Sequence, residues 1–214
     1  MEGMRITKFG HACVRLGHEG HAVVLDPGMF TDPEAVDGAT AVLVTHEHAD
    51  HLHVDHLRAT DAPIWTIAAV ARAIAEQAPD LTERVTVVAP GDQFDAAGVR
   101  VTAVGEQHAV IHPAYDRITN SGYVVELGDR SVFHPGDALT GPGRAVDVLL
   151  APVSAPWLKV GEAIDFAREV GAPTNLAIHD RVYSDAGLSM TDGHFRTLLA
   201  EGQTYARIAD GADL

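Results

Sequence analysis

The chain has 214 residues, of which 46% are hydrophobic and 21% are charged. These values are typical of a folded globular protein, and we expect a single domain over residues 1–214. The formal net charge of −15 would repel a phosphate backbone or an anionic lipid surface, so no nucleic-acid or membrane partner is expected.

The first half of the chain begins with short strand-like segments. We expect strands over residues 5–9, 12–16, 21–25 and 41–45. The turn-forming run Asp26-Pro27-Gly28 ends the first three. A helix is expected in or just after residues 46–51, and another over 67–77 that stops before Pro79.

Cys13, in the second of these strands, is the only cysteine. The chain therefore cannot form an internal disulfide, and we expect this thiol to be buried and inert. Residues 1–8 contain no apolar signal segment, so the expected location is cytoplasmic. An oligomer is compatible with this composition.

The second half repeats the order of elements seen in the first. We expect strands over residues 85–88, 99–104, 123–127, 130–134, 146–151 and 176–178, and helices over 161–170 and 192–200. A meander followed by helices, occurring twice, predicts an α/β fold: a four-layer αβ/βα sandwich of two mixed sheets with outer helices.

Metal-competent side chains crowd the segment that follows the apolar strand over 41–45. His46, His48, Asp50 and His51 lie within six residues, where a strand end would present a site. Imidazole and carboxylate together suit zinc, iron or manganese. This segment therefore predicts a metal centre.

Three further candidates also follow strand-like segments. They are His108, Asp137 and His179. Any one alone is more often an ordinary polar residue, but their shared position indicates that they complete the centre.

The run His46-Glu47-His48-Ala49-Asp50-His51 matches the HxHxDH signature of the metallo-β-lactamase superfamily, and the three later candidates match its subsequent motifs in order. The chain thus resembles that superfamily over nearly its whole length. Residues 10–12, 25–27 and 122–126 are similar to the branch of the ascorbate-6-phosphate lactonases and small uncharacterised hydrolases.

The resemblance implies two divalent metal ions, Zn²⁺ first, with Mn²⁺ or Fe as alternatives. One metal would be held by His46, His48 and His108, and the other by Asp50, His51 and His179, with Asp137 bridging them. A hydroxide shared by the metals would attack the substrate, and Asp50 would also orient it as a catalytic residue. The family also suggests Asp26 as the residue that orients a ligand histidine.

Other residues near the motifs are candidates for support and substrate binding. Thr45 is expected to hydrogen-bond a ligand carboxylate, whereas His11 either supports the site or is simply packed. An irregular segment over 109–120 would form a lid beside the site, and residues near 157 and 181 its opposite rim. The candidate substrate contacts are His112, Tyr115, Arg117, Trp157 and Arg181.

Two departures from the lactonase-like pattern argue against assuming a phosphorylated sugar lactone as substrate. Ala138 stands where threonine or serine is usual, and residues 152–157 differ from the usual Pro-Ile-Gly stretch. Neither departure removes a ligand, but both alter the expected pocket wall.

The leading interpretation is a binuclear metal-dependent hydrolase of a small ester, lactone, amide or phosphoester. The full ligand set argues against a mononuclear-iron redox enzyme resembling persulfide dioxygenases. The negative charge argues against a nuclease of the transfer-RNA-processing type. A non-catalytic metal-dependent binding module is the remaining alternative.

Overall fold

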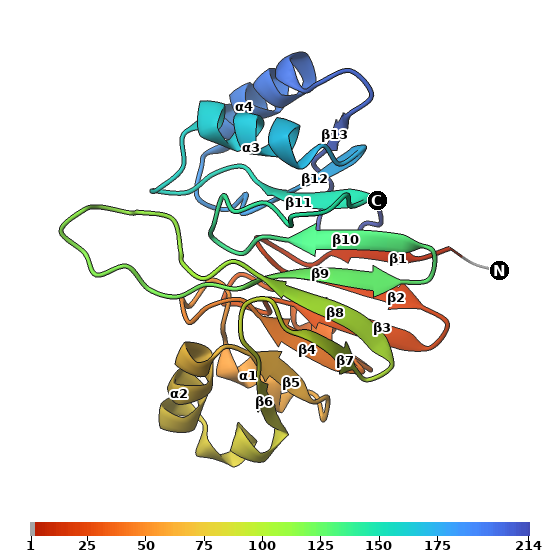
Figure 1. The fold of residues 1–214 in the computed structure, drawn as a ribbon, viewed down its shortest axis with the longest axis vertical. Coiled ribbons are helices and arrows are strands. Elements are labelled where there is room, and N and C mark those ends of the chain that lie inside the picture. Colours follow the sequence, from red (N-terminus) through yellow and green to blue (C-terminus); the bar gives the residue numbers. More distant parts are fainter. Residues whose placement is uncertain (1–2) are drawn as a thin grey trace.

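The computed structural model describes residues 3–214, and its strands form two mixed sheets (Figure 1). The first sheet has the order β1 (Arg5–Lys8), β2 (Val14–His18), β3 (His21–Leu25), β4 (Ala41–Val44), β5 (Ile64–Thr66) and β6 (Val85–Val87). The second has the order β13 (Thr204–Ala206), β12 (Thr174–Ile178), β11 (Val148–Pro152), β10 (Arg130–His134), β9 (Gly122–Leu127), β8 (Val99–Val104) and β7 (Gln93–Ala96). In each sheet an antiparallel meander continues into parallel strands.

Helices cover the outer faces of both sheets (Figure 1). They are α1 (Val54–Arg58), α2 (Ala68–Gln77), α3 (Val160–Val170) and α4 (Asp185–Leu198), with 3₁₀ turns η1 (Pro33–Val36) and η2 (Pro79–Arg84). One apolar cluster packs η1, α1 and α2 on the first sheet, a second packs α3 and α4 on the other, and a third lies between the sheets. The predicted four-layer αβ/βα sandwich is thus confirmed.

The alternation of side chains along each strand produces these layers. In β4, Leu43 packs between the sheets, whereas Val42 and Val44 pack beneath the helices. In β9, Val125 packs between the sheets, whereas Val124 packs beneath the helices. Because successive side chains in a strand point to opposite faces, these strands are apolar on both sides and buried throughout.

Several elements differ from the sequence-based expectation. Three short strands, β5, β7 and β13, were not predicted, and α4 begins at Asp185 rather than at residue 192. The helix starts earlier because the Ser184 side chain caps it, accepting a hydrogen bond from the backbone N–H of Gly187. Within residues 3–214, no helix is both long and apolar enough to cross a membrane.

Two further segments lie outside these helices and strands. The segment between β8 and β9 protrudes far from the body of the protein (Figure 1). The last residues return to β1, where Leu214 N–H donates a hydrogen bond to Ile6 O (2.9 Å). Thr7 and Asp213 form an isolated antiparallel β-bridge there.

Candidate metal centre

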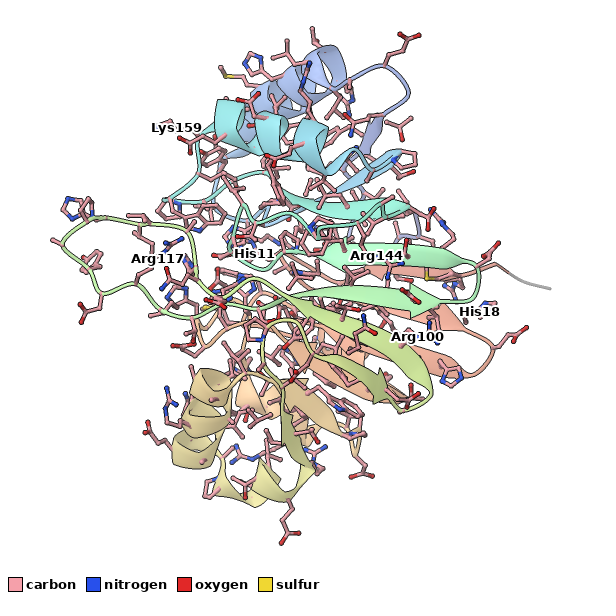
Figure 2. The ribbon with its side chains drawn as sticks, viewed as in Figure 1. His11, His18, Arg100, Arg117, Arg144 and Lys159 are labelled. Atoms are coloured by element: carbon pink, nitrogen blue, oxygen red, sulfur yellow. The ribbon has the colours of Figure 1, made fainter. Side chains whose placement is uncertain are left out.

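The metal-competent residues meet at the carboxyl ends of strands from both sheets. The segment 46–51 follows β4, while His108, Asp137 and His179 follow β8, β10 and β12. Because both sheets direct these ends to the same edge of the sandwich, residues distant in sequence face one another. His11 and Arg117 lie at this edge, from which the segment between β8 and β9 protrudes (Figure 2).

The backbone of the 46–51 segment is held against the turn that follows β3. Met29 N–H donates to Ala49 O (2.8 Å). A side-chain carbon at Gly28 would lie 1.9 Å from the carbonyl oxygen of Asp50 and 2.5 Å from the backbone nitrogen of His51. Glycine at position 28 is therefore required for the close approach that places Asp50 and His51.

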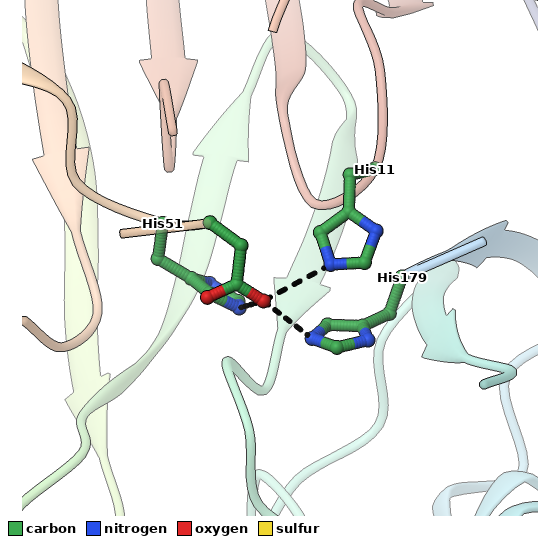
Figure 3. Close-up of side chains that lie close together, drawn as sticks. His11, His51 and His179 are labelled. Atoms are coloured by element: carbon green, nitrogen blue, oxygen red, sulfur yellow. Dashed lines mark hydrogen bonds and ion pairs between the residues drawn. The ribbon is translucent and has the colours of Figure 1, made fainter. Parts of the chain in front are cut away.

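The side chains form two groups, each with one ligand atom per residue and all of these atoms within 4.8 Å of one another. The first group contains His46, His48, His108 and Asp137. The second contains His11, Asp50, His51 and His179. Figure 3 shows His11, His51 and His179 reaching a common point from three separate segments.

The Asp137 carboxylate lies between the two groups. Its Oδ2 is 3.2 Å from His108 Nε2, and its Oδ1 is 3.1 Å from His51 Nε2 and 3.2 Å from His179 Nε2. One oxygen thus faces each group. Trp157 Nε1 donates a hydrogen bond to Oδ2 (3.0 Å), which fixes the carboxylate from the side of the second sheet.

The innermost polar atoms of this centre approach one another at 3.1–3.2 Å without the geometry of a hydrogen bond. They are His51 Nε2, His108 Nε2, His179 Nε2 and Asp137 Oδ1. Such atoms are costly to bury unsatisfied, and here they converge in a set of nitrogen and oxygen donors. The residues therefore fit divalent metal ions, which would satisfy them together.

Asp26 links ligand candidates of both groups. Its Oδ2 lies 2.6 Å from His51 Nδ1 and accepts a hydrogen bond from Thr45 Oγ1 (2.7 Å). Thr45 Oγ1 in turn lies 3.0 Å from His46 Nδ1. The proton on each Nδ1 is thereby directed to this network, which leaves Nε2 of His46 and His51 for a metal. Thr45 contacts Asp26 and His46 rather than a carboxylate of either metal-competent group.

Backbone carbonyls orient two further histidines. His108 Nδ1 lies 2.6 Å from Ala109 O, and His179 Nδ1 lies 2.5 Å from Ser154 O. In both residues the Nε2 atom is left to face the centre, the usual arrangement of metal-binding histidines.

His11 is the residue whose place in the centre the sequence left open. It is fully buried in a left-handed backbone conformation (φ 52°). Its Nδ1 accepts a hydrogen bond from the backbone N–H of Arg181 (3.2 Å), so its proton resides on Nε2, 3.1 Å from Asp50 Oδ2. The preceding Gly10 also has a positive φ (105°), so this glycine is the feature of the sequence that indicates the turn.

The carboxylates create a field that favours positive charge at the centre. Burial alone would lower the pKa of His179, but the Asp137 and Asp50 carboxylates outweigh it and raise this pKa to about 9. Burial would likewise raise the pKa of Asp137, yet His179 and His51 hold it well below its usual range. At His11, burial together with the neighbouring His179 and His51 outweighs the hydrogen bond to Asp50 and lowers the pKa to about 4, and burial also lowers the pKa of His46.

The predicted substrate contacts are dispersed around the centre. His112 and Tyr115 are exposed on the protruding segment, and Arg117 Nε donates to His108 O (2.5 Å). Trp157 is buried against Asp137, and the Arg181 side chain pairs with Asp210. The structure thus holds Trp157 and Arg181 in contacts within the protein.

Known proteins resemble this chain in sequence and in fold. A family model described as the beta-lactamase superfamily domain matches residues 5–179. Protein Rv0786c of Mycobacterium tuberculosis is 39% identical over 84% of this chain and 85% of its own length. A UPF0173 metal-dependent hydrolase of Methanopyrus kandleri is 31% identical over 69% of this chain and 66% of its own. The metallo-beta-lactamase fold protein YhfI from Bacillus subtilis shares the fold, with a TM-score of 0.73, 16% identity, and coverage of 99% of this chain and 98% of that chain.

Proposed function

Since this chain belongs to the metallo-β-lactamase superfamily, we propose that it is a two-metal hydrolase that acts on a small ester, lactone, amide or phosphoester. The matched region, residues 5–179, includes every residue of both metal-competent groups. A relative named as a metal-dependent hydrolase supports the same reaction class.

The position of Asp137 carries this proposal. Its two oxygens face different histidine groups at 3.1–3.2 Å, the arrangement expected of a carboxylate that bridges two cations. Negative charge between the groups would reduce the repulsion of two cations bound close together. A single metal would occupy only one of the two histidine groups that this carboxylate faces.

The surrounding residues have distinct roles in this proposal. His46, His48 and His108 hold one metal, and Asp50, His51 and His179 hold the other. His11 supports the second group by donating its Nε2 proton to Asp50. Two such cations, which we propose to be zinc, would lower the pKa of a bound water and polarise a carbonyl or phosphoryl oxygen.

Asp50 is suited to act on the nucleophile. Its side chain is 23% exposed, whereas Asp137 is almost fully buried, so Asp50 is the carboxylate that a substrate or water can approach. The hydrogen bond to His11 fixes Oδ2, which leaves its other oxygen to accept a hydrogen bond from the attacking group.

Elemental analysis combined with a panel of esters, lactones, amides and phosphodiesters tests the proposal. We expect about two metal ions per chain and hydrolysis of at least one substrate class. Asp137→Ala should lose metal and activity together. One iron per chain with oxygen uptake, or full activity in Asp137→Ala, would contradict it.

A further inference from the structure

Resting on the proposed function, we infer that the substrate carries an apolar alkyl, acyl or aryl group, bound by the segment between β8 and β9. A cavity of about 630 Å³ is lined by residues 108–113 and 115–118 of this segment, which include the polar His112, Asp116 and Arg117, and by His48 of the metal centre. Its inner end is formed by His48 and His108, and its outer wall includes Val110, Ile111 and Tyr115. A molecule in this cavity would touch the metal ligands and the apolar wall together.

Three large side chains of this wall are exposed together on one short segment. Val110 is 52% exposed, Ile111 43% and Tyr115 72%, in a protein whose net charge is −15. Clustered apolar side chains of this kind mark binding surfaces rather than ordinary loops. Their continuity with His48 and His108 favours a small molecule reacting at the metals over a macromolecular partner.

The wall is fixed to the centre at its base. Gln107 and Thr119 form a bridge that closes the protruding segment, and Ala109 N–H donates to Asp137 O (2.7 Å). Arg117 Nε donates to His108 O within the same segment. The apolar side chains therefore have a defined position relative to two metal-competent residues.

Apolar side chains are also exposed beside His11, at the second group. Met29 and Phe30 are 54% and 42% exposed, and the Phe30 ring lies 5.2 Å from that of His11. On the side of His179, the Arg181 side chain pairs with Asp210. The cavity volume is large enough for a drug-sized apolar ligand.

Binding of hydroxamic acids to the zinc-loaded protein tests this inference without relying on turnover. Isothermal titration calorimetry would compare butanohydroxamic with octanohydroxamic acid, which differ by four methylenes. Since burying a methylene contributes up to about fourfold in affinity, we expect the longer chain to bind at least about tenfold more tightly. Val110→Ser/Ile111→Ser should remove this gain and keep the metal content.

Met190→Ser is the matched control, because Met190 is 68% exposed on α4, outside the residues that line the cavity. It should keep the full chain-length dependence. Equal affinity for the two acids, no binding of the longer one, or an unchanged gain in the double variant would overturn the inference.

A second measurement separates this inference from the proposed function. Hydrolysis of γ-lactones with alkyl substituents from ethyl to hexyl should accelerate with chain length in the wild type. Hydrolysis independent of chain length would preserve the hydrolase and overturn the apolar site. If hydroxamate binding depends on chain length but the protein hydrolyses no substrate of the full panel, the apolar site would stand and the proposed hydrolase would be overturned.

Discussion

His11 Nε2 lies 3.1 Å from Asp50 Oδ2, and the opposite nitrogen of the same ring accepts a hydrogen bond from Arg181 N–H. The ring therefore connects Asp50 to the segment that carries His179. In this arrangement His11 donates to a ligand candidate, so we interpret it as a positioning residue rather than a metal ligand.

Removing this ring should loosen the second metal. His11→Ala leaves Asp50 without its donor, and we expect affinity for that metal to fall about 10- to 100-fold, with the first metal retained. Zinc titration of the metal-free protein would measure both sites. His11→Gln is the control, because its amide can donate to Asp50, and it should recover part of the affinity. Complete loss of the second metal in both variants would instead identify His11 as a ligand.

Asp26 should affect both metals, since it contacts His51 directly and His46 through Thr45. Asp26→Asn removes the charge that holds these rings, and we expect about 10-fold or greater weakening at each site. Thr45→Val should weaken mainly the site of His46. Competition with a fluorescent zinc chelator would resolve the two affinities. Equal effects of both variants on both sites would contradict the linkage.

Gly28→Ala should displace the metal-binding segment. The added carbon would overlap the peptide bond between Asp50 and His51, so the variant must shift that segment or lose stability. We expect reduced metal content by elemental analysis and a lower melting temperature. Gly161→Ala is the control, because a side-chain carbon at this position in α3 meets nothing within 4 Å, and it should leave metal content unchanged. Normal metal content in Gly28→Ala would contradict the steric argument.

Asp192 should contribute to stability outside the metal centre. It accepts hydrogen bonds from Tyr205 (2.7 Å) and from Nε and Nη2 of Arg207 (3.0 and 2.8 Å). Asp192→Asn should therefore lower the free energy of unfolding by about 1–3 kcal/mol at pH 7. Asp165→Asn, on the exposed face of α3, should change it by less than about 0.5 kcal/mol.

The effect of Asp192 should also depend on pH. Burial acts to raise its pKa, but hydrogen bonds from Arg207 and Tyr205 outweigh burial and lower it. A lowered pKa in the folded state stabilises the protein above the unfolded value of about 3.9 and loses that effect as the pH falls through the folded value. The stability difference between wild type and Asp192→Asn, measured by urea unfolding, should shrink below about pH 4. A difference that grows on acidification would show the opposite sign.

The sequence predicted the layers and most strands because their apolar periodicity is strong. The short strands β5, β7 and β13 have three or four residues each, too few for a clear pattern, and their pairing depends on neighbouring strands. The early start of α4 depends on a single capping side chain, Ser184.

The sequence likewise predicted some features of the candidate site and not others. Residues such as His108 and Asp137 could be proposed because each follows a recognisable strand, and the structure brings them together. The contact of Trp157 with Asp137 could not be predicted from the sequence, because it depends on how the segment after β11 folds back over the centre. The tautomer of His11 depends on a backbone N–H that lies 170 residues away in sequence.

The division of the centre between the two sheets has a consequence for cross-linking. A chain with one buried cysteine has no internal disulfide to join its halves. Bound metals would cross-link the two halves instead. They would join Asp50 and His51, which follow β4, to Asp137 and His179, which follow β10 and β12. Such links depend on metal supply rather than on redox state, so bound metal would add to the cohesion that the apolar layer between the sheets provides.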